Sequence, residues 1–187
     1  MNFNTHSNLE GKHAFLSASK YHWTNYDKEK LAAVWRSWQA TQRGTELHDF
    51  AKRCIELRQR LPKSRNTLNQ YVNDAIGFRM TPEQPLYFSD NCFGTADAIS
   101  FNERTNELRI HDLKTGETPA SIRQLEVYAA IFCLEYKKKP EELSMELRIY
   151  QNGEMVVHNP EPQDIRRIME TIIQFDRVIE KLKIKES

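Results

Sequence analysis

The chain has 187 residues, of which 39% are hydrophobic and 28% are charged, and its formal net charge is +1. This length fits one domain with a substantial hydrophobic core, and the composition is typical of a soluble globular protein. No apolar run approaches the ~20 residues needed to cross a bilayer, so we expect no membrane partner. A net charge near zero does not exclude a nucleic-acid partner, because a basic groove and an acidic metal site can cancel each other.

The N-terminal letters MNFNTHSNLEGKH contain neither the basic nor the apolar region of a signal peptide, so we expect a cytoplasmic protein. The three cysteines, Cys54, Cys92 and Cys133, lie far apart and form no C-x-x-C motif. An odd number at such spacing argues against a disulfide framework, a zinc site or a redox pair. We therefore expect them to be small core residues.

The first third of the chain predicts three helices. Residues 27–42 begin with acidic residues and contain a helical stripe of Leu31, Val34, Trp35 and Trp38, and Gly44 is expected to end this helix. A second helix is predicted over 45–61, where Pro62 stops it. Its expected inward residues are Leu47, Phe50, Ala51, Cys54 and Leu61. A third, over 66–76, ends at Gly77.

The pattern then changes to strands over 85–90, 92–101 and 107–114, with a hairpin turn over 102–107. Residues 119–136 are again helical, and 144–159 predict a hairpin around Asn152-Gly153, the strongest short-range hairpin signal. A long amphipathic helix over 161–185 ends the pattern. Its expected inward stripe is Ile165, Ile168, Met169, Ile172, Phe175, Ile179 and Leu182.

This order of elements predicts an α/β fold in a single domain, with one mixed central sheet flanked by helices on both faces. We divide the chain into an N-terminal helical part, 1–80, a sheet core, 81–136, and a C-terminal hairpin and long helix, 144–185.

Charged residues stand at the ends of two neighbouring predicted strands. Asp97 lies fifteen positions before Asp112, and the hairpin between them can bring the two side chains to within ~5 Å. Two carboxylates that close repel each other unless one takes up a proton or a cation lies between them. Oxygen-rich sites suit Mg²⁺ or Mn²⁺. Lys114 projects to the same face as Asp112. A carboxylate beside an ammonium group can hold a metal ion and a water, as metal-assisted hydrolysis requires.

The simplest interpretation of D-x-K is an exposed ion pair at a strand end, because the pattern arises by chance roughly once in a few hundred residues. Its context favours a function. Gln124 and Tyr128 are one turn apart on a helix face, and His48 lies beside the core stripe of its own helix. A lone histidine of this kind is more often a core or boundary residue than a ligand.

Taken together, these residues resemble the PD-(D/E)xK nuclease superfamily, in particular its RecB-like branch with the lambda-type phage exonucleases. The matching segments are Gly44-Thr-Glu-Leu-His48, Gly94-Thr-Ala-Asp97, Asp112-Leu-Lys114-Thr-Gly116 and Gln124-Leu-Glu-Val-Tyr128. The segment LSASK at 16–20 is similar to a short Ser-x-Ser segment near the start of such domains. The resemblance covers roughly residues 16–136, and the ordered set is more specific than any single motif. It implies a restriction-endonuclease-like core.

The resemblance also implies roles. His48, Asp97, Asp112 and the backbone carbonyl of Leu113 would bind one or two Mg²⁺ or Mn²⁺ ions. Lys114 would position the attacking water, or help to deprotonate it, and would stabilise the charged phosphorane. Gln124 and Tyr128 would orient Lys114 or a substrate phosphate. Because carboxylates around a lysine favour its cationic form, we prefer the electrostatic and positioning role for Lys114.

The resemblance stops short of two features of the superfamily. The iron–sulfur branch needs four cysteines, and only three are present, so we expect no cluster. No G-x-x-x-x-G-K-[ST] motor motif occurs, so the chain resembles stand-alone phage and mobile-element enzymes. If it belongs to a phage, its location would be the host cytoplasm. Lambda-type relatives form rings, so a homo-oligomer or a recombination or annealing partner is a further expectation.

Basic residues mixed with aromatic ones predict where DNA, as duplex ends or a single strand, would bind. The first region contains Ser17, Ser19, Lys20 and Trp23, a mixture suited to unstacked bases, although Trp23 could equally cover a helix start. The second contains Arg53 and Arg58, where nearby acidic residues dilute the charge.

We therefore expect a divalent-metal-dependent deoxyribonuclease, with exonuclease action on DNA ends preferred over site-specific cutting. One alternative is an inactive module that keeps the fold and binds DNA or a recombination partner. Another is an unrelated α/β protein whose D-x-K is an exposed ion pair.

Overall fold

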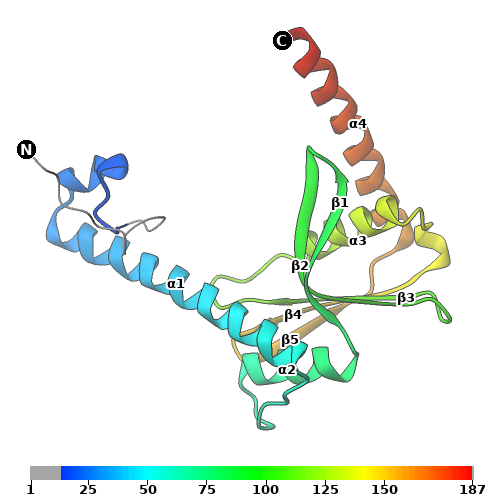
Figure 1. Ribbon diagram of the computed structural model, residues 1–187, viewed down its shortest axis with the longest axis horizontal. Coiled ribbons are helices and arrows are strands. Elements are labelled where there is room, and N and C mark those ends of the chain that lie inside the picture. Colours follow the sequence, from blue (N-terminus) through cyan, green and yellow to red (C-terminus); the bar gives the residue numbers. More distant parts are fainter. Residues whose placement is uncertain (1–13, 187) are drawn as a thin grey trace, which may run out of the picture. The chain divides into compact units, whose positions relative to one another are not determined.

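The computed structural model describes residues 14–186 of the chain (Figure 1). Residues 1–13, which gave the expectation about a signal peptide, lie outside the described residues. The chain divides into two compact units, 1–45 and 46–187, and the boundary falls inside helix α1 (Lys28–Glu56). The prediction of a single domain stays a prediction. No helix in the described part of the chain is long and apolar enough to cross a membrane.

The first unit contains the 3₁₀ segment η2 (Ala18–Asn25) and the start of α1. Asp27 caps the helix, because its Oδ1 accepts a hydrogen bond of 2.7 Å from the Lys30 amide. The ring of Phe15 packs on Trp35 and Trp38, at centroid distances of 4.9 and 5.6 Å. Aromatic contacts therefore hold this unit together.

Helix α1 corrects the prediction of two helices separated at Gly44. The helix continues through Gly44 to Glu56, because an interior glycine costs only about 1 kcal/mol relative to alanine. It also ends well before Pro62. Arg58 adopts a left-handed conformation, φ 53°, and the Gln59 amide donates to the Cys54 carbonyl at 2.8 Å. This Schellman arrangement, rather than the proline, stops the helix.

The same cap ends two more helices, α2 (Thr67–Gly77) and α3 (Arg123–Glu135). Arg79 and Lys137 take the left-handed position there, with φ of 55° and 52°. Glycine is the usual residue at such a position, since a left-handed conformation costs other residues ~1–2 kcal/mol. A cation near the helix C-terminus recovers part of this cost through the helix dipole.

The second unit contains a five-stranded sheet in the order β1-β2-β3-β4-β5. Its strands are β1 (Thr81–Ser89), β2 (Cys92–Asn102), β3 (Glu107–Leu113), β4 (Ser144–Gln151) and β5 (Glu154–His158). Strands β3 and β4 are parallel and joined through α3, and the other neighbours are antiparallel. The short 3₁₀ segment η3 (Pro140–Glu142) precedes β4. The predicted α/β class with a mixed sheet is confirmed.

A hydrophobic core lies on each face of the sheet. The first core joins the sheet to α3 and to helix α4 (Pro162–Glu186), and its buried residues include Leu86, Ala96, Ile99, Leu108, Ile110, Leu125, Ala129, Phe132, Leu147, Ile149 and Ile165. The second core joins the sheet to α2 and the end of α1, and its buried residues are Ala51, Cys54, Ile55, Tyr71, Val72, Ala75, Met80, Ala98, Leu113 and Tyr150. Helices therefore cover both faces, as predicted.

The cysteines fit the core interpretation. Cys54 and Cys133 are buried, Cys92 is half-buried against the first core, and all three are free.

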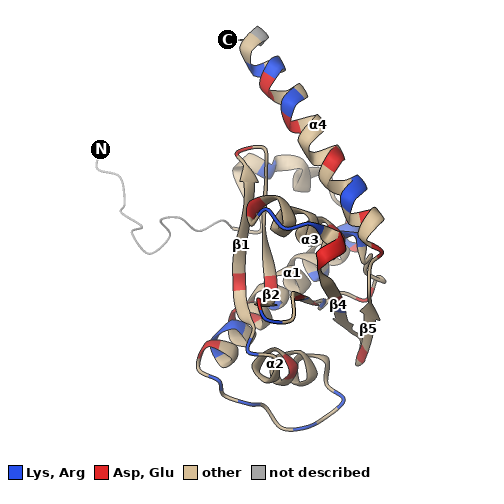
Figure 2. Ribbon diagram, turned by 90° about the vertical axis from the view of Figure 1, so that its right-hand side faces the viewer, with Lys and Arg blue, Asp and Glu red and all other residues tan. Residues whose placement is uncertain are grey.

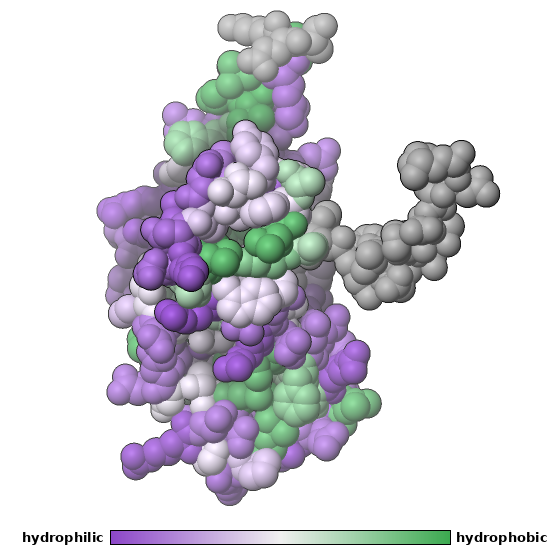
Figure 3. Space-filling model, turned by 90° about the vertical axis from the view of Figure 1, so that its left-hand side faces the viewer, coloured by the Kyte–Doolittle hydropathy of each residue, from purple (hydrophilic) through white to green (hydrophobic). Residues whose placement is uncertain are grey.

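Several residues predicted to point inward are exposed. Phe50 of α1 is 46% exposed, and in α4 the exposed fractions of Phe175, Ile179 and Leu182 are 59%, 38% and 48%. The apolar stripe of α4 packs on the first core only as far as Ile172 (Figure 1). Beyond it, Asp176 and Glu180 still accept hydrogen bonds from Ser89 and Asn91 at the β1–β2 turn. Apolar side chains accordingly reach the surface at the far end of α4, at the top of Figure 3. Periodicity predicted the stripe correctly but not how much of it is covered.

The turn between β4 and β5 gives a prediction about stability. Gly153 has φ +78°, and a Cβ added there would lie 3.3 Å from the Arg65 carbonyl oxygen. Its amide also donates to Thr67 Oγ1 at 2.6 Å. Gly153→Ala should therefore lower the free energy of unfolding by about 1–2 kcal/mol, measured by urea titration with circular dichroism. Gly116→Ala is the matched control, because nothing lies within 4 Å of its added Cβ. Equal midpoints for the two variants would contradict this account of the turn.

Candidate active site

Strands β2 and β3 separate at the two candidate aspartates. Their ladder ends at the pair Ala98–His111, so Asp97 and Asp112 occupy the next opposed positions without pairing. The alternation of β2 breaks at the same point. Ala96 belongs to the first core and Ala98 to the second, although residues two apart in a regular strand face the same side. In Figure 1, β1 and β2 stand up from the plane of β3 and β4. The pairing of the two strands thus stops at the aspartates.

Asp97 is held in place at the end of the ladder by a backbone donor. Its Oδ2 accepts a hydrogen bond of 2.8 Å from the Leu113 amide. His48 Nδ1, from α1, lies 3.6 Å from the same oxygen. The predicted neighbourhood of His48 and Asp97 is therefore present. Leu113 contributes its backbone amide, which donates to Asp97. The role of its carbonyl as a metal ligand stays a prediction.

Glu83 is a third member of this group that the sequence reasoning missed. The pairs Pro82–Ala98 and Gln84–Ala96 place it opposite Asp97, and acidic positions lie at one level on β1 and β2 in Figure 2. Its φ of 48° is left-handed, so the strand is distorted at this residue. Its Oε1 lies 3.8 Å from His48 Nδ1, and one ligand atom from each of His48, Glu83 and Asp97 lies within 4.8 Å of the others.

A second set of predicted residues forms a chain of hydrogen bonds. Lys114 Nζ donates to Asp112 Oδ1 at 3.0 Å and to Gln124 Oε1 at 2.9 Å. The Gln124 amide in turn donates to the Tyr128 hydroxyl at 3.1 Å. The Tyr128 ring is positioned by Gly94, because a Cβ there would lie only 2.9 Å from Tyr128 Cε1. Glycine at 94 therefore lets helix α3 approach β2 closely.

Burial destabilises the charged forms of both aspartates. Asp112 is 2% exposed, and its Oδ2 has no hydrogen-bond partner among the described residues. Desolvation raises the pKa of Asp112, while Lys114 opposes that rise. Desolvation, together with the charge of Asp112, raises the pKa of Asp97 from 3.8 to about 6, against the influence of His48 and the Leu113 amide. Lys114 and His48 therefore offset only part of the cost of burying these two carboxylates.

The donors present fit a hard divalent ion. They are one imidazole and carboxylate oxygens, without a thiolate, which is the ligand chemistry of Mg²⁺ or Mn²⁺ sites. His48, Glu83 and Asp97 are close enough to share one ion. The unpartnered Asp112 Oδ2 is a further acceptor close enough to affect the pKa of Asp97.

A hollow of about 240 Å³ adjoins the lysine side of the site. It is lined by Leu47, Asn66, Thr67, Leu68, Leu113, Lys114, Thr115 and Asn152. Lys114 thus reaches open space as well as Asp112.

The residues predicted to bind nucleic acid lie in both units and are described separately. In the first unit, the hydroxyls of Ser17 and Ser19 are 2.8 Å apart, and Trp23 Nε1 donates to the Ser17 carbonyl at 2.9 Å. Lys20 and Trp23 line a cavity of about 250 Å³ there. In the second unit, Arg53 and Arg58 are exposed. Their binding role stays a prediction.

Comparisons with known proteins add no relatives. Neither a scan against models of protein families, nor a search of curated proteins, nor a search of solved structures finds a match to this chain. The conclusions about the site therefore depend on its geometry.

The raised pKa of Asp97 predicts how stability depends on pH. A carboxyl whose pKa is about 6 when folded and 3.8 when unfolded binds its proton more tightly in the folded state. Its contribution is complete below the unfolded pKa and is lost as pH rises through the folded pKa. Without metal, the free energy of unfolding of Asp97→Asn, relative to that of the parent, should therefore rise by about 2 kcal/mol as the pH increases from about 4 to about 7.

Urea titrations across this pH range in the presence of a chelator measure the difference. Asp164→Asn, which removes a half-exposed carboxylate of α4, is the control. A pH profile of Asp97→Asn that parallels the control would show that Asp97 is not destabilised by its surroundings.

Proposed function

We propose that the protein is a divalent-metal-dependent phosphodiesterase that hydrolyses DNA, acting on ends as an exonuclease. The observation that supports this proposal is the end of the β2–β3 ladder, where buried carboxylates, an imidazole and an anchored lysine gather. A purely structural ion pair would not need two desolvated aspartates across an unpaired stretch of sheet.

His48, Glu83, Asp97 and Asp112 are the residues that would hold Mg²⁺ or Mn²⁺. A bound ion would supply positive charge against the phosphate and lower the pKa of a coordinated water. The protein's part is to fix the ligands beforehand. The Leu113 amide fixes Asp97, and the left-handed conformation at Glu83 directs that side chain toward His48.

Lys114 supplies a fixed positive charge beside the reacting phosphate. Asp112 and Gln124 each accept one hydrogen bond from its ammonium group, which leaves a third donor for a phosphate oxygen or for the attacking water. Tyr128 orients Gln124, so it acts on Lys114 indirectly. Charge held in place before the reaction is the main source of catalysis in phosphodiester hydrolysis.

DNA in the cytoplasm is the proposed substrate, and the reaction requires neither a motor nor an iron–sulfur cluster. Linear ends are preferred in this proposal over internal sites.

Cleavage assays test the catalytic roles. Linear labelled DNA should be degraded in Mn²⁺ and remain intact in a chelator, and Asp112→Asn or Lys114→Ala should lower the rate at least about a hundredfold. Lys139→Ala is the matched control, because that lysine makes only an exposed pair with Glu142. Circular DNA in the same assay separates exonuclease from endonuclease action. If Lys114→Ala cleaves as fast as Lys139→Ala, the proposed mechanism is wrong.

Thermal unfolding tests the metal site without requiring activity. A ligand that binds only the folded state stabilises it by about 2.7 kcal/mol at 100 times its dissociation constant, so saturating Mn²⁺ should raise the melting temperature by several degrees. Asp97→Asn and Glu83→Gln should each lose most of this gain, whereas Asp164→Asn should keep it. Metal binding together with DNA binding but no cleavage would favour the inactive module instead.

A further inference from the structure

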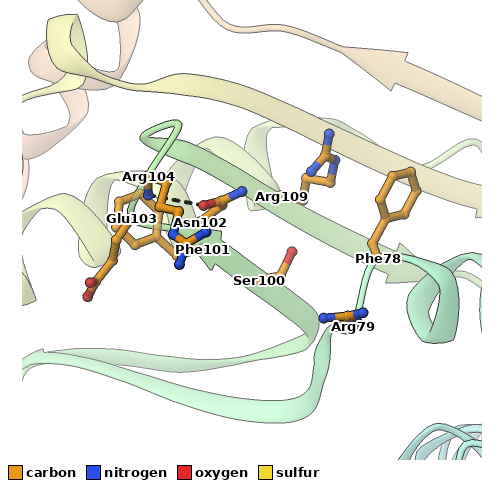
Figure 4. A pocket seen from close by; sticks show the side chains of 8 residues that line it. All are labelled: Phe78, Arg79, Ser100, Phe101, Asn102, Glu103, Arg104 and Arg109. Carbon is orange, nitrogen blue, oxygen red and sulfur yellow. Dashed lines mark hydrogen bonds between the residues drawn. The ribbon is translucent and has the colours of Figure 1, made fainter.

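A second hollow lies at the turn end of the β2–β3 pair, away from the candidate active site. Its volume is about 650 Å³, within the range of ligand pockets. It lies between the end of α2 and the sheet (Figure 4). The residues that line it are Phe78, Arg79, Ser100, Phe101, Asn102, Glu103, Arg104 and Arg109, and we name it the arginine pocket.

The pocket has an excess of positive charge. Three guanidinium groups line it against a single carboxylate, that of Glu103, which Figure 4 shows directed away from Arg79, Ser100 and Arg109. Arg109 is paired with Glu107 and Glu146 and lies over the Phe78 ring at 4.5 Å. It is therefore a rigid part of the wall, with its charge largely balanced.

The side chains of Arg79 and Arg104 remain available. Across residues 14–186 neither guanidinium makes an ion pair or a hydrogen bond. Ser100, opposite Arg109 in the β2–β3 register, adds a hydroxyl. Asn102 uses its Oδ1 to accept from the Arg104 amide at 3.0 Å, which leaves its NH₂ group as a donor. Most polar groups facing the hollow are thus donors.

This combination selects an anion with several acceptor oxygens. A guanidinium presents a planar fork that matches phosphate in a bidentate manner. The pocket therefore suits a phosphate group.

One end of the pocket lies near the candidate active site along β2. Ser100 is three residues beyond Asp97 on β2, which corresponds to about 10 Å at ~3.3 Å per residue. Phosphates along one strand of B-form DNA advance ~3.4 Å each along the helix axis. About three phosphates thus separate Asp97 from the Ser100 end of the pocket, and Arg104, in the β2–β3 turn, lies farther along.

We propose that the arginine pocket binds a phosphate group, and that this phosphate belongs to the same DNA strand as the bond cleaved at Asp97, about three or more phosphates away. The second half of this proposal rests on the proposed function. A free nucleotide would present the same chemistry, so the experiment separates the two sources.

Arg79→Gly is the test variant, because glycine suits the left-handed position and the change removes only the side chain. Lys137→Gly is the matched control, since it makes the same exchange at the same cap position of α3 and does not touch the pocket. Both variants should fold, which circular dichroism checks. Arg104→Ala is a second pocket variant on a different element.

Fluorescence anisotropy with a labelled oligonucleotide in a chelator measures binding without cleavage. Arg79→Gly and Arg104→Ala should each weaken binding about tenfold at low salt, and each should reduce the slope of log affinity against log salt by about one. Lys137→Gly should bind like the parent. If the pocket variants match Lys137→Gly in affinity and slope, the proposal is overturned.

Orthophosphate and deoxyadenosine monophosphate separate the sources of the phosphate. If they raise the melting temperature of the parent but not of Arg79→Gly, while oligonucleotide binding is unchanged by the substitution, the assignment to the DNA strand is wrong. Weaker oligonucleotide binding by both pocket variants supports that assignment.

The two proposals also fail separately. A parent protein that never cleaves DNA but loses binding in Arg79→Gly would overturn the nuclease and keep the pocket. Cleavage that depends on Asp112, together with an Arg79→Gly variant whose KM and DNA binding match those of the parent, would keep the nuclease and overturn the pocket.

Discussion

The hydrogen bond from the Leu113 amide to Asp97 Oδ2 holds the candidate site together. It bridges the point where the β2–β3 ladder stops, so a side chain replaces the next strand pairing. This bond keeps a carboxylate near Asp112 despite their mutual repulsion and the loss of water, which together raise the pKa of Asp97 to about 6. Lys114 offsets part of the same cost at Asp112. The part of the burial cost that Lys114 does not offset makes the surroundings of the two aspartates better suited to a cation than to apolar packing.

Local patterns in the sequence predicted much of this arrangement. The Asn152-Gly153 turn, the α/β order of elements and the Gln124–Tyr128 pair depend on residues close together in the chain or on one helix face, whereas the contact of Gln124 with Lys114 was suggested by the family resemblance. Their geometry follows from the periods of helix and strand. The neighbourhood of His48 and Asp97, by contrast, was suggested by the family resemblance and not by spacing.

Other features depend on tertiary context that a single sequence does not contain. Glu83 joins the site only through the register of β1 against β2 and a left-handed backbone, and no motif marks it. Gly44 does not interrupt α1, because its cost is small against the rest of a long helix. Arg58 ends that helix in a conformation that usually signals glycine. The length of α4 that is covered depends on the size of the body beneath it, so periodicity placed Phe175 and Leu182 inward wrongly.

The parallel pairing of β3 with β4 has a consequence for the order of folding. The antiparallel run β1-β2-β3 joins consecutive segments, whereas β4 can pair only after the intervening helix has formed and returned the chain. Closing the longer loop costs more chain entropy and is slow. Asp97 and Asp112 can therefore come together in an early meander, before the sheet is complete. Repulsion between their carboxylates would then act during folding as well as in the finished sheet.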